Sequence, residues 1–121
     1  MLVTTLDDPL GQLLNSGTAM AAAWGDAARH VQMVLTLLMG APLLADALGL
    51  TSVRFVMRPD QRAAAVRGPA TITLSCLDSV GVALPFLLPA PPDLAAASAV
   101  RVEQVQVQIQ QQRRHTAAGR R

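Results

Sequence analysis

The spacing of apolar residues predicts a long helix near the start of the chain. Pro9-Leu10 suits a helix start, because proline fits the first helical position, where no backbone N–H is needed. From Leu10 to Leu38, apolar or small residues recur three and four positions apart, which is typical of a helix with one apolar face. The pattern predicts one helix over residues 9–39, ended by glycine and proline, and a short second helix over residues 43–48.

After these helices the period changes from helical to alternating, which is typical of strands. Residues 52–58 and 70–76 alternate apolar and polar side chains, and residues 82–88 begin in the same way before Pro85 confines them to a sheet edge. Residues 62–67 fit either a loop or a weak edge strand. Helices followed by strands predict an α+β fold, in which the long apolar helix packs on a mainly antiparallel sheet or sandwich of about three to five strands.

The last predicted strand covers residues 99–111 and contains a change of parity. Its apolar side chains are Val100, Val102, Val105, Val107 and Ile109. The first two share one parity and the other three share the opposite one. One extra residue at Glu103-Gln104, a β-bulge, would place them all on one face. The opposite face would then carry Arg101, Gln106, Gln108 and Gln110.

Composition and charge favour a single domain over residues 1–112 with a flexible basic tail over residues 113–121. The chain has 121 residues, of which 51% are hydrophobic and 15% charged, so disorder is excluded for most of it. The tail carries Arg113, Arg114, Arg120 and Arg121. Removing these from the ten basic residues leaves six Arg against eight acids. The basic character therefore belongs to the tail, and no specific nucleic-acid partner is expected.

Three further features of the sequence predict a cytoplasmic protein. The segment from Met1 to Asp8 is acidic, where a secretory signal needs a basic start. The uncharged apolar run over residues 31–45 is shorter than the roughly 20 residues that span a bilayer. Cys76 is the only cysteine, so it cannot form an intramolecular disulfide, which fits a reducing compartment.

The order of these features resembles a widespread family of small bacterial proteins known only as a domain of unknown function. The matching pieces are Pro9-Leu10, Ser52-Val53-Arg54-Phe55-Val56, the stretch from Leu84 to Pro91, and Val100-Arg101-Val102-Glu103-Gln104-Val105. The Ala-rich insert over residues 93–99 departs from that layout. The resemblance implies the same helix-then-sheet architecture and supplies no catalytic residues.

Candidate catalytic chemistry is sparse, so the sequence predicts a protein that is not an enzyme. Cys76, His30 and Asp78 are a conceivable nucleophile set, but an inward strand position favours a packing role for the cysteine. No metal-ligand spacing occurs, since a metal site needs three or four ligands and the histidines and cysteines of the chain total three. No Gly-rich phosphate loop is present, and no cofactor is expected.

Two segments are candidates for contact with a partner. The first is an apolar helical surface formed by Val31, Val34, Leu35, Leu38, Leu43, Leu44 and Leu48. The second is the segment over residues 105–112, which carries Gln106, Gln108 and Gln110 and has high β propensity, no proline and no charge. They predict a structural protein that forms homo-oligomers or docks on a protein partner.

Two alternatives remain open. One is a peripheral protein whose apolar helices lie in an anionic membrane surface, with the Arg-rich tail at the headgroups. The other is a small-ligand-binding module with a cavity between helix and sheet.

Overall fold

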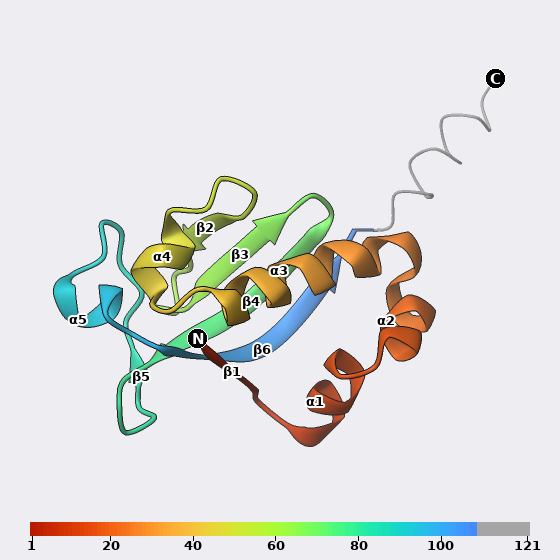
Figure 1. Cartoon of the computed structure of the whole chain (residues 1–121), viewed down its shortest axis with the longest axis horizontal. Helices are drawn as coiled ribbons and strands as arrows, with labels where there is room; N and C mark the ends of the chain where they lie inside the picture. The colour runs from red at the N-terminus through yellow and green to blue at the C-terminus, as the bar shows by residue number, and fades with distance from the viewer. Residues whose placement is uncertain (109–121) are drawn as a thin grey trace.

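The computed structural model describes residues 1–108 and has an α+β fold, in which the helix labelled α3 crosses one face of a single sheet and α1 and α2 lie beside it (Figure 1). The helical segments are α1 (Asp8–Leu14), α2 (Gly17–Trp24), the 3-10 turn η1 (Gly25–Ala27), α3 (Ala28–Gly40), α4 (Leu44–Leu48) and α5 (Pro92–Ala95). The strands are β1 (Leu2–Thr5), β2 (Arg54–Met57), β3 (Ala63–Arg67), β4 (Ala70–Leu77), β5 (Ala83–Leu84) and β6 (Ala99–Val107). The tail predicted over residues 113–121 lies outside the described residues.

The single long helix predicted over residues 9–39 is not confirmed. Asn15 ends α1, and the Ser16 side chain caps α2 by accepting a hydrogen bond from the Ala19 backbone N–H at 3.1 Å. Gly25 then ends α2 with a φ of +59°, a conformation that glycine adopts without steric cost. The apolar spacing continues across both breaks, which is why the periodicity alone does not reveal them. The short helix predicted over residues 43–48 is present as α4.

The sheet has six strands in the order β1-β6-β4-β3-β2, and β5 pairs with the end of β4. All pairs are antiparallel except β1 with β6. The prediction of a mainly antiparallel sheet is therefore confirmed. The structure has one sheet and no sandwich within the described residues, and the sheet has more strands than the three to five expected. The ambiguous segment 62–67 is β3, which pairs on both sides, and β1 was not predicted at all. The strand predicted over residues 82–88 shrinks to Ala83–Leu84, directly before Pro85, which has no N–H to donate.

The predicted β-bulge in the last strand is confirmed. Thr73 of β4 pairs with Gln104 of β6, whereas the next residue, Leu74, pairs with Val102. Glu103 is therefore the extra residue, and it lies between two ladder positions without a partner of its own. The strand predicted over residues 99–111 is described as far as Val107, and residues 109–111 lie outside the described range.

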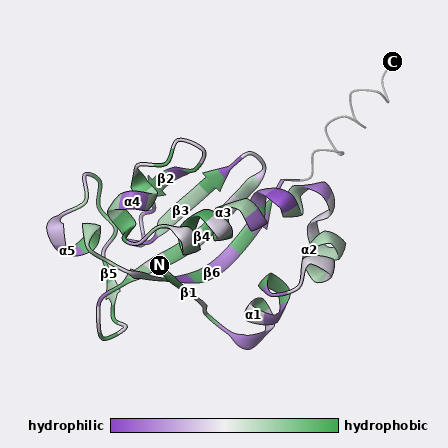
Figure 2. Ribbon diagram, in the orientation of Figure 1, coloured by the Kyte–Doolittle hydropathy of each residue, from purple (hydrophilic) through white to green (hydrophobic). Residues whose placement is uncertain are grey.

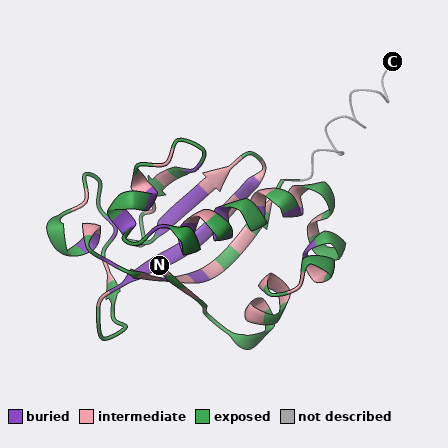
Figure 3. Cartoon of the chain, viewed as in Figure 1, coloured by how far each residue is buried: buried purple, intermediate pink, exposed green. Residues whose placement is uncertain are grey.

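The hydrophobic core lies between α3 and the inner face of the sheet. Its fully buried members include Val31, Leu38, Ile72, Leu74 and Val100. Figure 2 shows hydrophobic residues along β4 and hydrophilic stretches interrupting β6. Figure 3 shows burial concentrated in β3 and β4, whereas α1 and α2 are mostly exposed or half-buried. The helical arm formed by α1 and α2 therefore adds little to the core.

Candidate functional site

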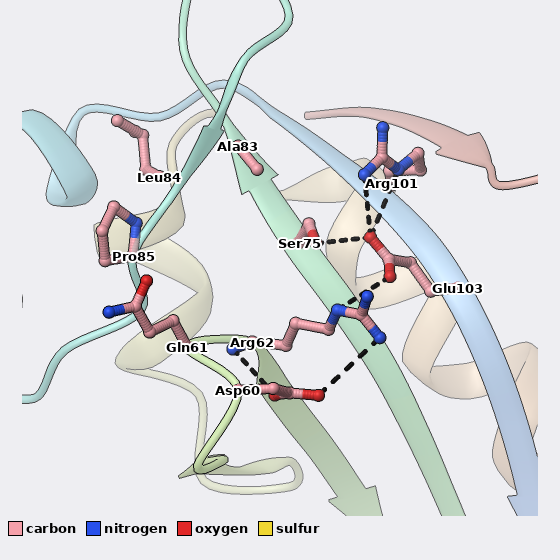
Figure 4. A pocket seen from close by; sticks show the side chains of 9 residues that line it. All are labelled: Asp60, Gln61, Arg62, Ser75, Ala83, Leu84, Pro85, Arg101 and Glu103. Atoms are coloured by element: carbon pink, nitrogen blue, oxygen red, sulfur yellow. Dashed lines mark hydrogen bonds and ion pairs between the residues drawn. The ribbon is translucent and has the colours of Figure 1, made fainter.

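A polar pocket of about 180 Å³ lies on the outer face of the sheet, the face opposite α3 (Figure 4). Side chains from β4, β6, the turn between β2 and β3, and the segment around β5 line it. The shortest polar contacts in the pocket join Glu103 to Ser75, Arg62 and Arg101. We take this pocket as the candidate site because it gathers ionised groups from segments far apart in the chain.

Glu103 is the central group of the pocket, and the bulge places it there. Its side chain is only 3% exposed. Carboxylate oxygen Oε2 accepts hydrogen bonds from Ser75 Oγ at 2.5 Å, Arg101 Nη2 at 2.9 Å and Arg101 Nε at 3.3 Å. Oxygen Oε1 lies 3.0 Å from Arg62 Nε. Both carboxylate oxygens are therefore occupied by donors.

The surroundings of Glu103 keep its carboxylate ionised. Burial alone would raise its pKa, but the hydrogen bonds from Ser75 and Arg101 and the charges of Arg62 and Arg101 outweigh burial and hold the pKa below its ordinary value. A carboxylate is a poor general base when its pKa is lowered and both of its oxygens already accept hydrogen bonds. The arrangement therefore favours binding or structure over acid–base catalysis.

The turn before β3 holds Arg62 in position. Gln61 has a φ of 68°, and the Asp60 carboxylate accepts the Arg62 backbone N–H at 3.2 Å. The same carboxylate lies 3.7 Å from Arg62 Nη1 and 3.6 Å from Arg58 Nε. The Gln61 carbonyl also accepts the backbone N–H of Phe86, which is buried, at 2.9 Å. The turn is thereby tied to the segment that forms the opposite wall of the pocket.

The structure places most of the predicted apolar contact surface inside the core. Five of its seven side chains are buried: Val31, Val34, Leu35, Leu38 and Leu44. Leu43 is 39% exposed and Leu48 is half-buried. The helix face predicted to meet a partner packs instead on the chain's own sheet.

The predicted strand surface is only partly described. Gln106 and Gln108 are exposed. Gln110, Arg113, Arg114, Arg120 and Arg121 lie outside the described residues.

The conceivable nucleophile set is not assembled. Cys76 is buried in the core, and burial raises the pKa of its thiol to about 12. His30 Nδ1 lies 2.8 Å from Arg67 Nη1, and Asp78 accepts the Val80 and Val82 backbone N–H groups, each at 2.9 Å. Each member therefore has its own separate partners. Among residues 1–108, no group of three or more His, Cys, Asp or Glu side chains could hold a metal ion.

The two halves of β6 differ in their pairing. Residues Ala99–Val102 lie between β1 and β4, and the Leu6 N–H still donates to the Val102 carbonyl at 2.9 Å. From Glu103 to Val107, β4 is the only strand partner within the part of the chain that the structure describes. In Figure 1 the chain leaves β1 at this point and turns into α1. Within the described residues, the first half of β6 therefore has a strand on each side, whereas its second half, Glu103–Val107, has a strand on one side and is a sheet edge.

Comparisons with known proteins give no further assignment, because the chain matches no family model, no curated protein and no solved structure. The resemblance to a bacterial family of unknown function stays a prediction. Within residues 1–108, no helix has both the length and the apolar character needed to cross a membrane.

The sequence gives only part of the signal for the pocket. The parity change in β6 locates the bulge and the outward position of Arg101, but it treats Glu103 merely as the residue where the register shifts. Arg62 and Ser75 approach Glu103 only because β3, β4 and β6 lie in one sheet. A charged residue at a predicted bulge, flanked by a well-defined strand, is the one local signal that could have singled out Glu103.

Proposed function

We propose that the protein is a non-enzymatic interaction protein that pairs with a second copy of itself through the free half of β6. The observation that carries this proposal is the end of β1 pairing at Val102, which leaves Glu103–Val107 with one strand partner in the described chain. An exposed strand edge is a template for pairing with another strand.

The backbone of this half has groups available for pairing. The Gln108 N–H donates to the Pro69 carbonyl at 2.9 Å, so this position is hydrogen-bonded to the β4 side. In an antiparallel pair the hydrogen-bonded positions alternate. The backbone N–H and C=O groups of Val105 and Val107 are therefore directed away from β4, toward the free edge.

The side chains of this half are compatible with a two-fold partner. An antiparallel pair centred on Val105 would set Gln104 opposite Gln106 of the second copy, and neither carries a charge that would be repelled. The Glu103 carboxylate is already bound to Arg62 and Arg101. A two-fold interface needs such a self-complementary patch.

Association through this edge should be weak. A strand pair of this length forms a small interface compared with the roughly 1,600 Å² of typical stable complexes. The membrane alternative has less support, because the apolar helix face on which it depended is buried against the sheet.

The test is light scattering of the full chain over the micromolar range with charge-swapped variants. The wild type should show a concentration-dependent dimer. The Gln104→Lys/Gln106→Lys variant should be monomeric because like charges would meet across the pair, and so should Gln104→Glu/Gln106→Glu. An equimolar mixture of the two variants should restore a dimer.

Val56→Lys provides the matched control. Val56 is a 39% exposed residue on β2, the strand at the opposite edge of the sheet. This substitution should leave the dimer intact. A monomeric wild type throughout the micromolar range contradicts the proposal, and so does a dimer that only Val56→Lys disrupts.

A further inference from the structure

A second pocket lies between α5 and the loop that joins β4 to β5, and we call it the end pocket because it lies at the end of the sheet where β6 begins. Its volume is about 320 Å³. The carboxylates of Asp78 and Asp93 line it, and among residues 1–108 no arginine or histidine does. In Figure 1, α5 and this loop lie at the opposite end of the sheet from the point where the described chain stops. The end pocket is therefore acidic.

The two carboxylates of the end pocket have no cationic partner in the described part of the chain. Asp78 Oδ1 accepts the backbone N–H groups of Val80 and Val82, each at 2.9 Å, and these donors carry no charge. Asp93 is exposed. The ion pairs of residues 1–108 involve other acids. A pocket lined by charges of one sign attracts ions of the opposite sign, so the end pocket favours a cationic occupant.

The sequence supplies cations in Arg113 and Arg114, five and six residues after Gln108. They cannot reach the end pocket of their own chain. Gln108 lies ten residues along the strand from Ser98, which lines the pocket, and ten strand residues span about 30 Å. Six residues of fully extended chain cover at most about 22 Å. These two arginines can therefore enter an end pocket only in another copy.

The second copy in the proposed β6 dimer presents its end pocket at the required distance. In an antiparallel pair centred on Val105, residue 108 lies level with residue 102 of the second copy, and each further residue moves one position toward the start of that β6. By this count Arg113 is level with Ala97 and Arg114 with Ala96, and both alanines line the end pocket. Because β1 already pairs with residues 99–102, the contact is made by side chains and not by an added strand.

We propose that Arg113 and Arg114 of each copy bind the end pocket of the other copy and pair there with Asp78 and Asp93. This proposal rests on the β6 pairing proposed above and names the second contact of that dimer. A guanidinium suits the site, since its planar fork binds carboxylates and its methylene stem can lie along the apolar side chains of Leu77 and Ala97. The two-fold axis repeats the contact, so the dimer gains four ion pairs in addition to a short strand pair.

The test is a double-mutant cycle on the dissociation constant of the dimer. Light scattering of the full chain measures it at low ionic strength, where exposed ion pairs are least screened. Arg113→Gln/Arg114→Gln should raise the dissociation constant about fivefold, because four weak ion pairs are lost at once. Asp78→Asn/Asp93→Asn should raise it by the same factor, and an asparagine oxygen can still accept the hydrogen bonds of the loop. All four substitutions together should cost no more than either pair alone, since both pairs remove the same contact.

Asp26→Asn/Asp46→Asn is the matched control. It makes the same change in net charge at two exposed carboxylates outside the end pocket, and Asp46, like Asp78, accepts a backbone N–H. It should leave the dissociation constant close to that of the wild type, and its small effect should add to that of the arginine substitutions. Asp93→Asn alone repeats the test without a change in the loop, and it should weaken the dimer by a smaller factor than the double substitution does.

The outcomes separate this proposal from the β6 pairing. A dimer that is unaffected by Arg113→Gln/Arg114→Gln overturns the end-pocket contact and leaves the strand pairing in place, and the pocket would then take a different cation or none. Simple additivity in the cycle has the same meaning, as does equal weakening by the control, which would show an effect of net charge alone. A wild type that is monomeric throughout the micromolar range overturns both proposals.

Discussion

On β4, the side chains of Ile72, Leu74 and Cys76 belong to the core beneath α3, whereas Thr71, Thr73 and Ser75 lie on the opposite face. Both sets are largely buried: Leu74 is 0% exposed and Thr73 is 1% exposed. The inner set is covered by a helix. The outer set has long charged side chains over it, since Arg62 reaches across β4 to Glu103 in Figure 4.

This difference shows two ways to bury a sheet face. The inner face gains stability from apolar area removed from water, which is large and insensitive to pH. The outer face depends on each buried polar group finding a partner, so its contribution is smaller and depends on protonation. Substitutions on the two faces should therefore differ in size and in pH dependence.

The largest effect is expected on the inner face. Leu74→Ala should lower the free energy of unfolding by about 3 kcal/mol, because it removes buried methyl groups and leaves a cavity. Urea denaturation measures it. Val56→Ala, at a 39% exposed position, should change the same quantity by less than about 0.5 kcal/mol. Equal losses in the two variants would contradict the assigned core.

Glu103→Gln should have the next largest effect. It leaves Arg62 and Arg101 without their carboxylate and should lower the free energy of unfolding at pH 7 by about 2 kcal/mol. The pKa of Glu103 is lower in the folded chain than its ordinary 4.5, so its stabilisation is complete above about pH 4.5 and is lost as the pH falls through the folded-state pKa.

The difference between wild type and Glu103→Gln should therefore shrink in acid. Denaturation at a series of pH values measures this difference. A gap that stays constant down to the lowest pH at which the chain folds would mean that the carboxylate does not act through its charge.

Thr73→Val should stabilise the protein. The Thr73 hydroxyl is buried and has no hydrogen-bond partner within the described chain. An unsatisfied buried hydroxyl is costly, so replacing it with a methyl group should raise the free energy of unfolding by about 1 kcal/mol. The melting temperature measures the change, and Thr71→Val, at a half-buried position on the same face, is the comparison. A destabilised Thr73→Val would indicate that the hydroxyl has a partner after all.

The smallest effect is expected at His30 of α3, whose ring lies beside Gly68 in the turn between β3 and β4 and whose Nδ1 is 2.8 Å from Arg67 Nη1. Burial, with Arg67 and Arg29 nearby, lowers the pKa of His30 from its ordinary 6.5. The folded chain therefore favours neutral His30, and stability should fall slightly as the pH drops below about 6.5. His30→Gln should remove that part of the pH dependence. An unchanged profile between pH 7 and pH 5 would exclude His30 as its source.

The sequence predicts those features of this fold that depend on local pattern. The bulge at Glu103 follows from the parity change, and the inward set of β4 follows from its alternation. The breaks at Ser16 and Gly25 do not show in the apolar spacing, which continues through both, although a glycine inside a helical pattern is by itself a weak point. β1 is missed because four residues are too few to show a period.

The pocket could not be predicted because its members are brought together by strand order. Glu103 and Arg62 are far apart in the chain, and β4 lies between their strands in the sheet. The buried apolar helix face was expected to be a contact surface for a related reason. Periodicity shows that a face is apolar, but only the tertiary structure shows what covers it.

The parallel pairing of β1 with β6 also affects how the chain reaches this structure. Leu2 pairs with Ala99, and Thr5 pairs with Val102, so the first strand has no place in the sheet until the last strand has formed. Contacts between residues so distant in sequence raise the contact order and slow folding. During synthesis, residues 2–5 therefore cannot pair with β6 until nearly the whole domain has emerged from the ribosome.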